Sequence, residues 1–542
     1  MNSNGLHRAA VLLVLLVSYS AAANAYAGGM PDQSGDATYR NPIIYADYSD
    51  PDVIRVGDDF YLTASSFNCV PGLPILHSHD LVNWKIIGHA LKRLPPEDVF
   101  SKPQHGNGVW APAIRYHAGE FFIFYPDPDR GIYLVKAKDA AGPWSEPLLI
   151  KAAKGWIDPC PLWDTDGKAY LVSAMAASRS GIKSILIVSR MSEDGTRLLD
   201  DGAIVFDGHD QNPTVEGPKF YKRNDYYYIF APAGGVESGW QLVLRSKNIF
   251  GPYEARKVLA QGKTDINGPH QGAWVETQTG ESWFIHFQDR RAYGRIVHLQ
   301  PMRWTNDWPV IGNDFDGVGE PVLKFRKPNV GRSWPAETIA DSDEFNDSVP
   351  GPQWQWQANP GTNWMFPANA LGVVRLFNVL LPNDYKNFWD VPNLLLQKFP
   401  AAEFTVTTKI TFTPRADQEK TGLIVMGLDY SYISIQQKAG KLFVSQAVCK
   451  DADRQTAETE SPPVEVKSNL IYLRVEVGAV CRFSFSLDGA RFTPIGVPFQ
   501  ARQGRWIGAK VGLFAVGAEQ TREMGYADVD WFRVQKQFYL ED

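Results

Sequence analysis

The stretch Gly57–Ser65, GDDFYLTAS, is a polar turn followed by aromatic and β-branched residues. This pattern is typical of the second strand of a β-hairpin. Four later stretches repeat it: GEFFIFYP from Gly119, GKAYLVSA from Gly167, NDYYYIFAP from Asn224 and ESWFIHFQ from Glu281. Their starts are spaced by roughly 50 to 60 residues, the length of a four-stranded propeller blade. The repeat therefore predicts an all-β fold that begins with a five-bladed β-propeller over residues 40–325.

A second feature recurs eight to eleven residues before these turns, where the first strand of each blade opens. The five openings read SDPDVI, VWAPAI, IDPCPLW, VEGPKF and HQGAWV, and they carry Asp50, Trp110, Asp158, Glu216 and His270. Because the first strand of a blade lines the central axis, these side chains are expected to meet around one axial cavity. Ionisable groups gathered in this way favour catalysis. The competing interpretation is that Asp50 and Asp158, each followed by proline, only cap turns.

Cleavage of a glycosidic bond needs at least two carboxyl groups, one on each side of the sugar. One of them stays protonated and protonates the leaving oxygen, while the other is ionised and activates water or attacks the anomeric carbon. A third carboxylate beside the acid raises the pKa of that acid by charge repulsion. The three acidic residues of the repeat fit this division of work.

Composition narrows the classes of function. The net charge is −6 and no basic run resembles a nucleic-acid footprint, so nucleic acid is excluded as a partner. The 17 tryptophans suit either a sheet core or the stacking of sugar rings. Neither a zinc-binding spacing nor a G-x-S-x-G elbow occurs, which leaves a zinc hydrolase or an acyl hydrolase without support.

The N-terminal segment predicts export. Arg8 precedes the apolar run Ala9–Val17, and two A-x-A matches end at Ala25 and Ala27. This is the pattern of a secretory signal over residues 1–27, with an apolar run too short to span a bilayer. We therefore expect an exported protein, periplasmic or extracellular, without a membrane anchor. Export permits one disulfide in each half of the chain, although the sequence does not establish a bridge among Cys69, Cys160, Cys449 and Cys481.

The repeat ends near residue 325. Residues 326–340, RKPNVGRSWPAETIA, contain proline and glycine and are predicted to be a linker. Alternating segments such as FTVTTKITFTP follow, and they predict an antiparallel β-sandwich over residues 341–536. The short linker favours a sandwich packed on the propeller over a binding module on a flexible tether.

The motifs together resemble glycoside hydrolase family 43, which comprises β-xylosidases, α-L-arabinofuranosidases and their relatives. The resemblance rests on five motifs, one from each blade: Asn41-Pro42 with Ser49–Asp52, VWAP at 109–112, IDP at 157–159, VEGP at 215–218 and GPHQG at 268–272. It implies inversion at the anomeric carbon, with Asp50 as general base, Glu216 as general acid and Asp158 as pKa modulator. DEFND, QWQWQANP and GYADVDWFRV resemble the concanavalin-like jelly roll that lends a loop to the mouth of the site in such β-xylosidases.

The resemblance also suggests residues that contact the sugar. Arg290, in HFQDR, and Arg295, in YGR, are rival candidates for binding the pentose hydroxyls. Trp110 and Phe67 are expected as walls of the sugar site, and blade packing is the alternative role for Trp110. His270 matches an axial histidine that in some members coordinates calcium through waters; an ordinary hydrogen-bonding role is the alternative, and the chemistry requires no cofactor.

His77 and His79 share a strand face, but the segment is interpreted as a repeated blade strand, and no metal is expected there.

The predicted function is that of an exo-acting, inverting hydrolase that releases terminal β-D-xylosyl residues from xylo-oligosaccharides. An α-L-arabinofuranosidase acting on arabinose-substituted glycans, or a bifunctional enzyme, is the first alternative. A propeller that binds glycans without cutting them is the alternative from another class. The sequence leaves the oligomeric state open, a homo-oligomer included.

Overall fold

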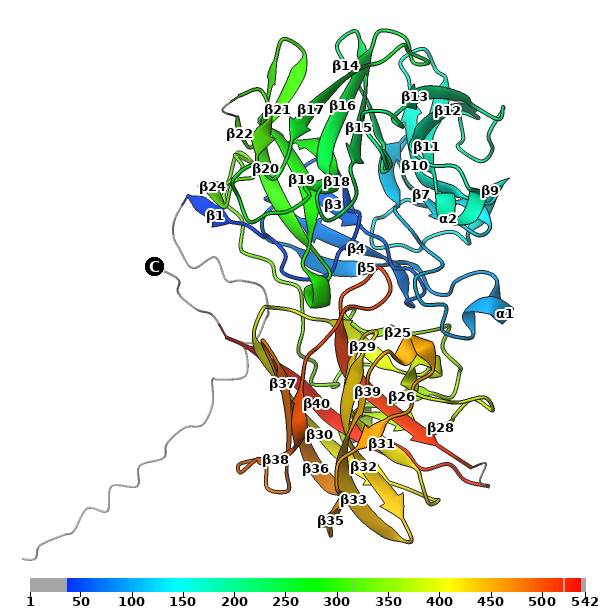
Figure 1. The fold of residues 1–542 in the computed structure, drawn as a ribbon, viewed down its shortest axis with the longest axis vertical. Helices are drawn as coiled ribbons and strands as arrows, with labels where there is room; N and C mark the ends of the chain where they lie inside the picture. The colour runs from blue at the N-terminus through cyan, green and yellow to red at the C-terminus, as the bar shows by residue number, and fades with distance from the viewer. Residues whose placement is uncertain (1–36, 315, 520–521, 538–542) are drawn as a thin grey trace, which may run out of the picture.

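The computed structural model describes residues 37–314, 316–519 and 522–537. The expected secretory segment, residues 1–27, lies outside these ranges. The described chain forms two bodies packed against each other, a propeller coloured blue to green and a sandwich coloured yellow to red (Figure 1). Within these ranges, no helix has the length and apolar character that a membrane crossing requires.

Five sheets form the propeller, and the first four strands of each sheet follow one another in chain order. The first two blades hold β2 (Asp52–Val56), β3 (Asp59–Thr63), β4 (Gly72–Ser78), β5 (Lys85–Leu91), β6 (Ala113–His117), β7 (Glu120–Asp127), β8 (Gly131–Ala137) and β9 (Leu148–Ala152). The third and fourth hold β10 (Trp156–Trp163), β11 (Ala169–Met175), β12 (Ile185–Met191), β13 (Ala203–Asp207), β14 (Lys219–Arg223), β15 (Tyr226–Ala233), β16 (Trp240–Ser246) and β17 (Glu254–Leu259). The fifth holds β18 (His270–Glu276), β19 (Ser282–Asp289), β20 (Arg295–Thr305) and β21 (Trp308–Ile311). Two short strands, β22 (Asn313–Asp314) and β23 (Gly319–Glu320), extend the fourth blade.

The predicted hairpins form because the sequence supplies both a residue suited to the turn and an apolar face on the strand that follows it. Val56 pairs with Asp59, so a two-residue turn closes the first hairpin, and Gly57 takes the left-handed φ of +64° that such a turn favours. Beyond the turn, Phe60 and Leu62 are buried against the fifth blade. Each neighbouring pair of blades shares an apolar core of this kind. The innermost strand β2 contacts both β6 and β18, so the ring of blades is closed and the five-bladed prediction is confirmed.

The chain leaves the propeller along its surface. The strand β1 (Thr38–Arg40) pairs with β24 (Lys324–Arg326), which joins the two ends of the propeller segment. Residues 327–340, here called the strap, then cross blades one and five. Asn329 accepts a hydrogen bond of 2.6 Å from Thr279, Val330 is buried, and Arg332 pairs with Asp58 at 2.7 Å. The predicted linker is thus held against the propeller along its length.

Two sheets form the sandwich. One contains β25 (Gln355–Trp356), β28 (Val379–Leu380), β29 (Leu395–Lys398), β31 (Lys420–Met426), β32 (Tyr430–Lys438), β33 (Lys441–Cys449), β34 (Thr459–Glu460), β35 (Val464–Val466) and β39 (Lys510–Gly517). The other contains β26 (Met365–Ala368), β27 (Val373–Phe377), β30 (Phe404–Thr413), β36 (Leu470–Val477), β37 (Cys481–Ser486), β38 (Thr493–Phe499) and β40 (Tyr526–Lys536). The strands of both sheets pair antiparallel except for β28, which pairs with β39 in parallel. Alternate residues of β30 are buried between the sheets, as its period of two requires.

Helices are few and short in the described ranges. They are α1 (Glu97–Phe100), α2 (Ala177–Ser180) and four 3-10 turns, η1 (Arg291–Tyr293), η2 (Asn369–Leu371), η3 (Phe388–Asp390) and η4 (Ala452–Arg454).

Polar contacts join the sandwich to the propeller. Val70 and Trp356 exchange backbone hydrogen bonds, and the buried Asn359 side chain bonds both polar groups of the Leu94 backbone. Lys510 donates to the thiol sulfur of Cys69 at 2.9 Å across the same interface. All four cysteines are buried free thiols, so neither half of the chain uses the disulfide that export would permit.

Candidate active site

The structure brings the three predicted carboxylates together. Asp50 directly precedes the Pro51 that leads into β2, Asp158 lies within β10, and Glu216 lies shortly before β14. These are the innermost strands of blades one, three and four. The groups interact electrostatically, since both aspartates raise the pKa of Glu216 and Asp50 raises the pKa of Asp158. The shared position in the repeat therefore creates one acidic site.

The backbone takes a positive φ at Asp50 and Asp158 and directly after Glu216. Asp50, Asp158 and Gly217 have φ values of +56°, +55° and +58°, and each directly precedes a proline. A positive φ is costly for a residue with a side chain, and such strain concentrates at functional sites. At Gly217 an added Cβ would lie 2.7 Å from the Gln271 side chain, so glycine meets both the conformation and the space there.

Asp50 is a carboxylate held by strong donors. Its Oδ2 accepts a hydrogen bond of 2.5 Å from the Ser65 hydroxyl, and its Oδ1 accepts one of 3.0 Å from Nη1 of Arg295. Asp50 and Arg295 are both buried, so the guanidinium neutralises the carboxylate in a site shielded from water. These two donors fix the orientation of the Asp50 side chain.

Asp158 has a weaker set of partners. Its Oδ2 accepts a hydrogen bond of 2.7 Å from the backbone N–H of Gly217, the residue after Glu216. Burial raises the pKa of Asp158, the Gly217 N–H opposes this rise, and the charge of Asp50 adds to it. Asp158 thus holds the segment that presents Glu216 and supplies negative potential next to it.

Glu216 is the most accessible of the three acids. Its side chain keeps 27% of its surface exposed, and its Oε1 lies 3.7 Å from Nε2 of His270. Burial is the main reason that its pKa is raised, and repulsion from Asp158 and Asp50 raises that pKa further. A carboxyl group that retains its proton near neutrality and still reaches solvent is suited to protonating a leaving group.

His270 lies beneath Glu216 as a neutral imidazole. It is 1% exposed, and burial together with Arg295 lowers its pKa to about 3. Neither ring nitrogen has a hydrogen-bond partner within the described chain. Calcium prefers six to eight oxygen ligands, whereas the charged groups that act on this ring in the described chain are the Glu216 carboxylate and the Arg295 guanidinium, which is itself a cation. The residues present therefore do not fit a direct calcium shell, and no step of the chemistry is derived through one.

The two rival arginines lie in different places. Arg295, at the start of β20, contacts Asp50 and stands 4.8 Å from the Phe287 ring. Arg290 is exposed and interacts with Tyr45 instead. Arg295 is therefore the arginine of the acidic site.

Aromatic side chains border the site. Trp110 is half-buried, donates its ring N–H to the Gly106 carbonyl at 2.8 Å and makes an edge contact with Trp506. Phe67 is 3% exposed and its backbone pairs with Val109, so it supports the segment that carries Trp110 and offers little surface of its own. Trp506 is 53% exposed and lies 6.0 Å from the Arg295 guanidinium.

Trp506 comes from the sandwich. It belongs to the loop of residues 500–509, between β38 and β39. Asp47 anchors this loop, because one carboxylate accepts from the backbone N–H groups of both Arg295 and Gly508. The Ala509 N–H also donates to Ala292 at 2.7 Å. The second body thus completes the surroundings of the acids.

Two residues of this site were not predicted from the sequence. Ser65 could have been found from the hairpin register. Asp52 pairs with Thr63, and continuing this register by two residues sets Ser65 opposite Asp50. Trp506 had no such signal, because its loop lies outside any repeat and far beyond the propeller's last strand in the sequence.

Known proteins resemble both bodies of this chain. Residues 39–309 match glycosyl hydrolases family 43, and residues 342–535 match the beta xylosidase C-terminal concanavalin A-like domain. A candidate beta-xylosidase from Xylanibacter ruminicola is 40% identical over 504 residues, which cover 91% of this chain and 89% of that protein. A non-reducing end alpha-L-arabinofuranosidase from Bacteroides ovatus is 30% identical over 525 residues, which cover 91% and 94%.

Solved structures agree with the sequence relatives. A xylan beta-1,4-xylosidase from Bacillus halodurans C-125 superposes with a TM-score of 0.81 at 26% identity, over 92% of this chain and 100% of that one. The similarity spans the propeller and the sandwich together. The resemblance inferred from the five motifs is confirmed, and this chain belongs to glycosyl hydrolases family 43 and is a glycosidase.

Proposed function

We propose that this glycosidase is an exo-acting, inverting enzyme that releases terminal β-D-xylosyl residues from xylo-oligosaccharides. The observation that carries the proposal is the unequal environment of its acids. Asp50 is paired with Arg295, while Glu216 has a raised pKa and an exposed side chain. Two carboxyl groups in opposite protonation states are what cleavage with inversion needs.

The reaction assigns one proton transfer to each of these groups. Glu216 donates its proton to the glycosidic oxygen as the bond from that oxygen to the anomeric carbon breaks. Asp50 accepts a proton from the water that attacks this carbon from the opposite face. The configuration at the anomeric carbon is therefore inverted. The proton taken from the water stays on Asp50 until it passes to solvent. This geometry requires a separation of about 6.5–9.5 Å between the two carboxyl groups.

The neighbouring residues adjust this chemistry. Asp158 raises the pKa of Glu216 and fixes its segment through Gly217. Arg295 orients Asp50 and retains further N–H groups that suit sugar hydroxyls. The exposed face of Trp506 suits the apolar C–H face of a pentose, and its loop borders the site, which supports action at a chain end.

The alternative with specific support is α-L-arabinofuranosidase activity, alone or in addition. The Bacteroides ovatus relative with that name is 30% identical to this chain. A propeller that binds glycans without cutting them is disfavoured, because the acids and the guanidinium lie together rather than apart. Export to the periplasm or the medium remains part of the proposal and rests on the N-terminal segment.

The experiment that tests the function is release of p-nitrophenol from p-nitrophenyl β-D-xyloside and from p-nitrophenyl α-L-arabinofuranoside. We expect faster release from the xyloside and, by NMR, α-xylose as the first product. Glu216→Gln should lose far more activity on xylobiose than on the aryl xyloside, whose leaving group needs little protonation. EDTA should leave both rates unchanged. Glycan binding without release from either substrate would replace the hydrolase with the binding propeller.

A further inference from the structure

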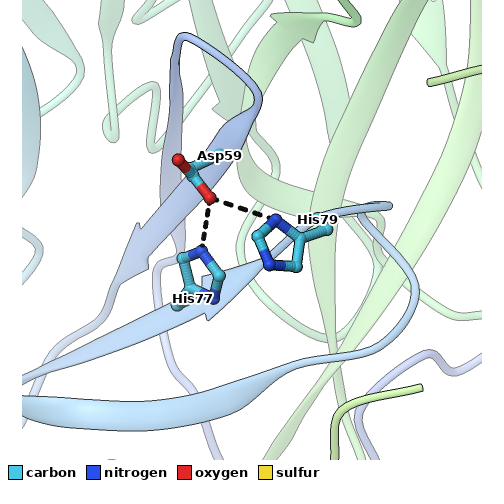
Figure 2. Close-up of side chains that lie close together, drawn as sticks. All are labelled: Asp59, His77 and His79. Carbon is cyan, nitrogen blue, oxygen red and sulfur yellow. Dashed lines mark hydrogen bonds and ion pairs between the residues drawn. The ribbon is translucent and has the colours of Figure 1, made fainter. Parts of the chain in front are cut away.

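Three side chains that commonly bind metals converge at the outer end of blade one. Asp59 opens β3, His77 lies near the end of β4, and His79 follows that strand. Phe60 is paired with Ser78, so the next pair in register is Asp59 with His79. Residues two apart in a strand share a face, which adds His77 to the same side. Figure 2 shows the carboxylate between the two imidazole rings.

The distances suit a bound ion. A single oxygen of Asp59, Oδ1, lies 2.8 Å from Nε2 of His77 and 3.0 Å from Nδ1 of His79. The three ligand atoms all lie within 4.8 Å of one another. Ligands about 2.0–2.1 Å from a tetrahedral zinc ion stand roughly 3.3 Å apart. A small outward movement of these side chains therefore makes room for the ion.

A carboxylate of the strap orients His77. Nδ1 of His77 lies 3.1 Å from Glu337 Oε2, and the other oxygen of Glu337 lies 2.6 Å from Lys85. Metal-bound histidines usually donate their second ring N–H to a carboxylate in this way. With that proton on Nδ1, Nε2 turns a lone pair toward Asp59. Two electron-rich atoms at 2.8 Å need a proton or a cation between them.

The second imidazole repeats this need. Nδ1 of His79 is buried and has no hydrogen-bond partner within the described residues, although Asp59 is close. The ring is held by stacking on Trp334 of the strap, at 3.9 Å with an interplanar angle of 9°. Both rings are thus fixed from outside the cluster and aim a nitrogen into it.

We propose that Asp59, His77 and His79 bind one divalent transition-metal ion of the zinc class, with water at the remaining position. Two imidazoles and a carboxylate suit zinc, whereas calcium and magnesium prefer oxygen ligands. Because β2 separates Asp50 from Asp59, the site lies at the opposite end of the blade from the sugar chemistry. Glu337 and Trp334 belong to the strap, so the ion ties the segment between the two bodies to blade one.

Metal-free full-length protein titrated with zinc chloride in a calorimeter tests this site. We expect one equivalent to bind with micromolar or tighter affinity and to raise the melting temperature by several degrees. His77→Ala and His79→Ala should each abolish this binding. Glu337→Gln should weaken it by about 10- to 100-fold, the usual effect of removing a carboxylate behind a metal-bound histidine.

The matched control is His209→Ala. His209 pairs with Asp207 at 2.6 Å but belongs to no such three-residue group in the described chain, so its loss should leave zinc uptake unchanged. Cobalt(II) bound to the unmutated protein should give the visible absorption of a four-coordinate site, which needs no variant to fold. No zinc uptake by the unmutated protein, or equal uptake after His77→Ala, would reduce the cluster to a hydrogen-bonded contact. Neither result bears on the hydrolase proposal.

Discussion

Asp50 and Asp158 occupy matching positions in blades one and three but have different electrostatic surroundings. Both precede a proline, both have φ near +55°, and their exposed fractions are 5% and 4%. Asp50 accepts from a guanidinium and a hydroxyl, while Asp158 accepts from one backbone N–H. The repeated backbone therefore sets where a carboxylate stands, and its neighbours set what that carboxylate can do.

Those neighbours come from other parts of the ring. Arg295 belongs to blade five and meets Asp50 because the ring closes between blades five and one. The partner of Asp158 precedes blade four, next to Glu216 in the chain. A closed propeller can thus give identical hairpins different chemistry. The following predictions test whether that difference determines the two roles.

The largest effect is expected for Asp50→Asn. The amide keeps the shape of the side chain but cannot accept the proton of the attacking water. General base catalysis contributes about 10²–10⁴-fold, and an inverting enzyme has no second nucleophile, so kcat on xylobiose should fall near the upper end of that range. Steady-state kinetics measure this fall.

Asp58→Asn is the control, because it also breaks an aspartate–arginine pair but does so on the surface, with Arg332. It should retain full activity. A loss in Asp50→Asn no larger than the loss in Asp158→Asn would remove the distinction between the two blades.

Much of this site was predictable from sequence, and the rest was not for a physical reason. The spacing of the hairpins placed Asp50, Asp158 and Glu216 around one axis. Consecutive strands build each blade, so a residue at a fixed distance before a hairpin opens the innermost strand of its blade. The choice between Arg290 and Arg295 was left open, since the two lie close together in the chain and only the turn at η1 decides which enters the site. Trp506 depended on how two bodies pack, which no periodicity encodes.

Asp158→Asn should have a smaller effect on kcat and a distinct effect on its pH dependence. The amide can still accept from Gly217, but a negative charge beside Glu216 is gone. Repulsion raises the pKa of Glu216, so removing it lowers that pKa, and the acid loses its proton at a lower pH. We expect kcat near neutral pH to fall by up to about tenfold for each unit by which the pKa of Glu216 drops, because less Glu216 stays protonated, and the alkaline limb to move toward acid.

Profiles of kcat against pH for both aspartate variants make the comparison direct. Asp158 and Glu216 interact strongly, so the limb reports the pair rather than one residue. An alkaline limb that stays in place after Asp158→Asn would mean that Asp158 only positions the Glu216 segment.

Trp506→Ala tests the contribution of the sandwich on the Asp50 side of the site. Trp506 stands beside Arg295, the partner of Asp50, and makes an edge contact with Trp110. Aromatic contacts are worth about 0.5–1.5 kcal/mol, so KM for xylobiose should rise by roughly two- to tenfold with kcat little changed. Trp506→Phe should recover most of the affinity. A fall in kcat with KM unchanged would show that the loop aligns Arg295 instead of binding sugar.

The smallest effect is expected for Ser65→Ala, which removes one of the two side-chain donors to Asp50 and keeps Arg295. A typical hydrogen bond contributes about 0.5–1.5 kcal/mol, and the Arg295 contact limits the loss to the lower end of that range, so kcat should fall by roughly two- to fourfold. Among the described residues Asp158 accepts no hydrogen bond from a hydroxyl, and the buried Ser173 hydroxyl of blade three has no hydrogen-bond partner there. Ser173→Ala should therefore leave kcat unchanged. If both serine variants behave alike, the Ser65 hydroxyl contributes only packing. Arg295 alone then distinguishes the carboxylate of blade one from that of blade three.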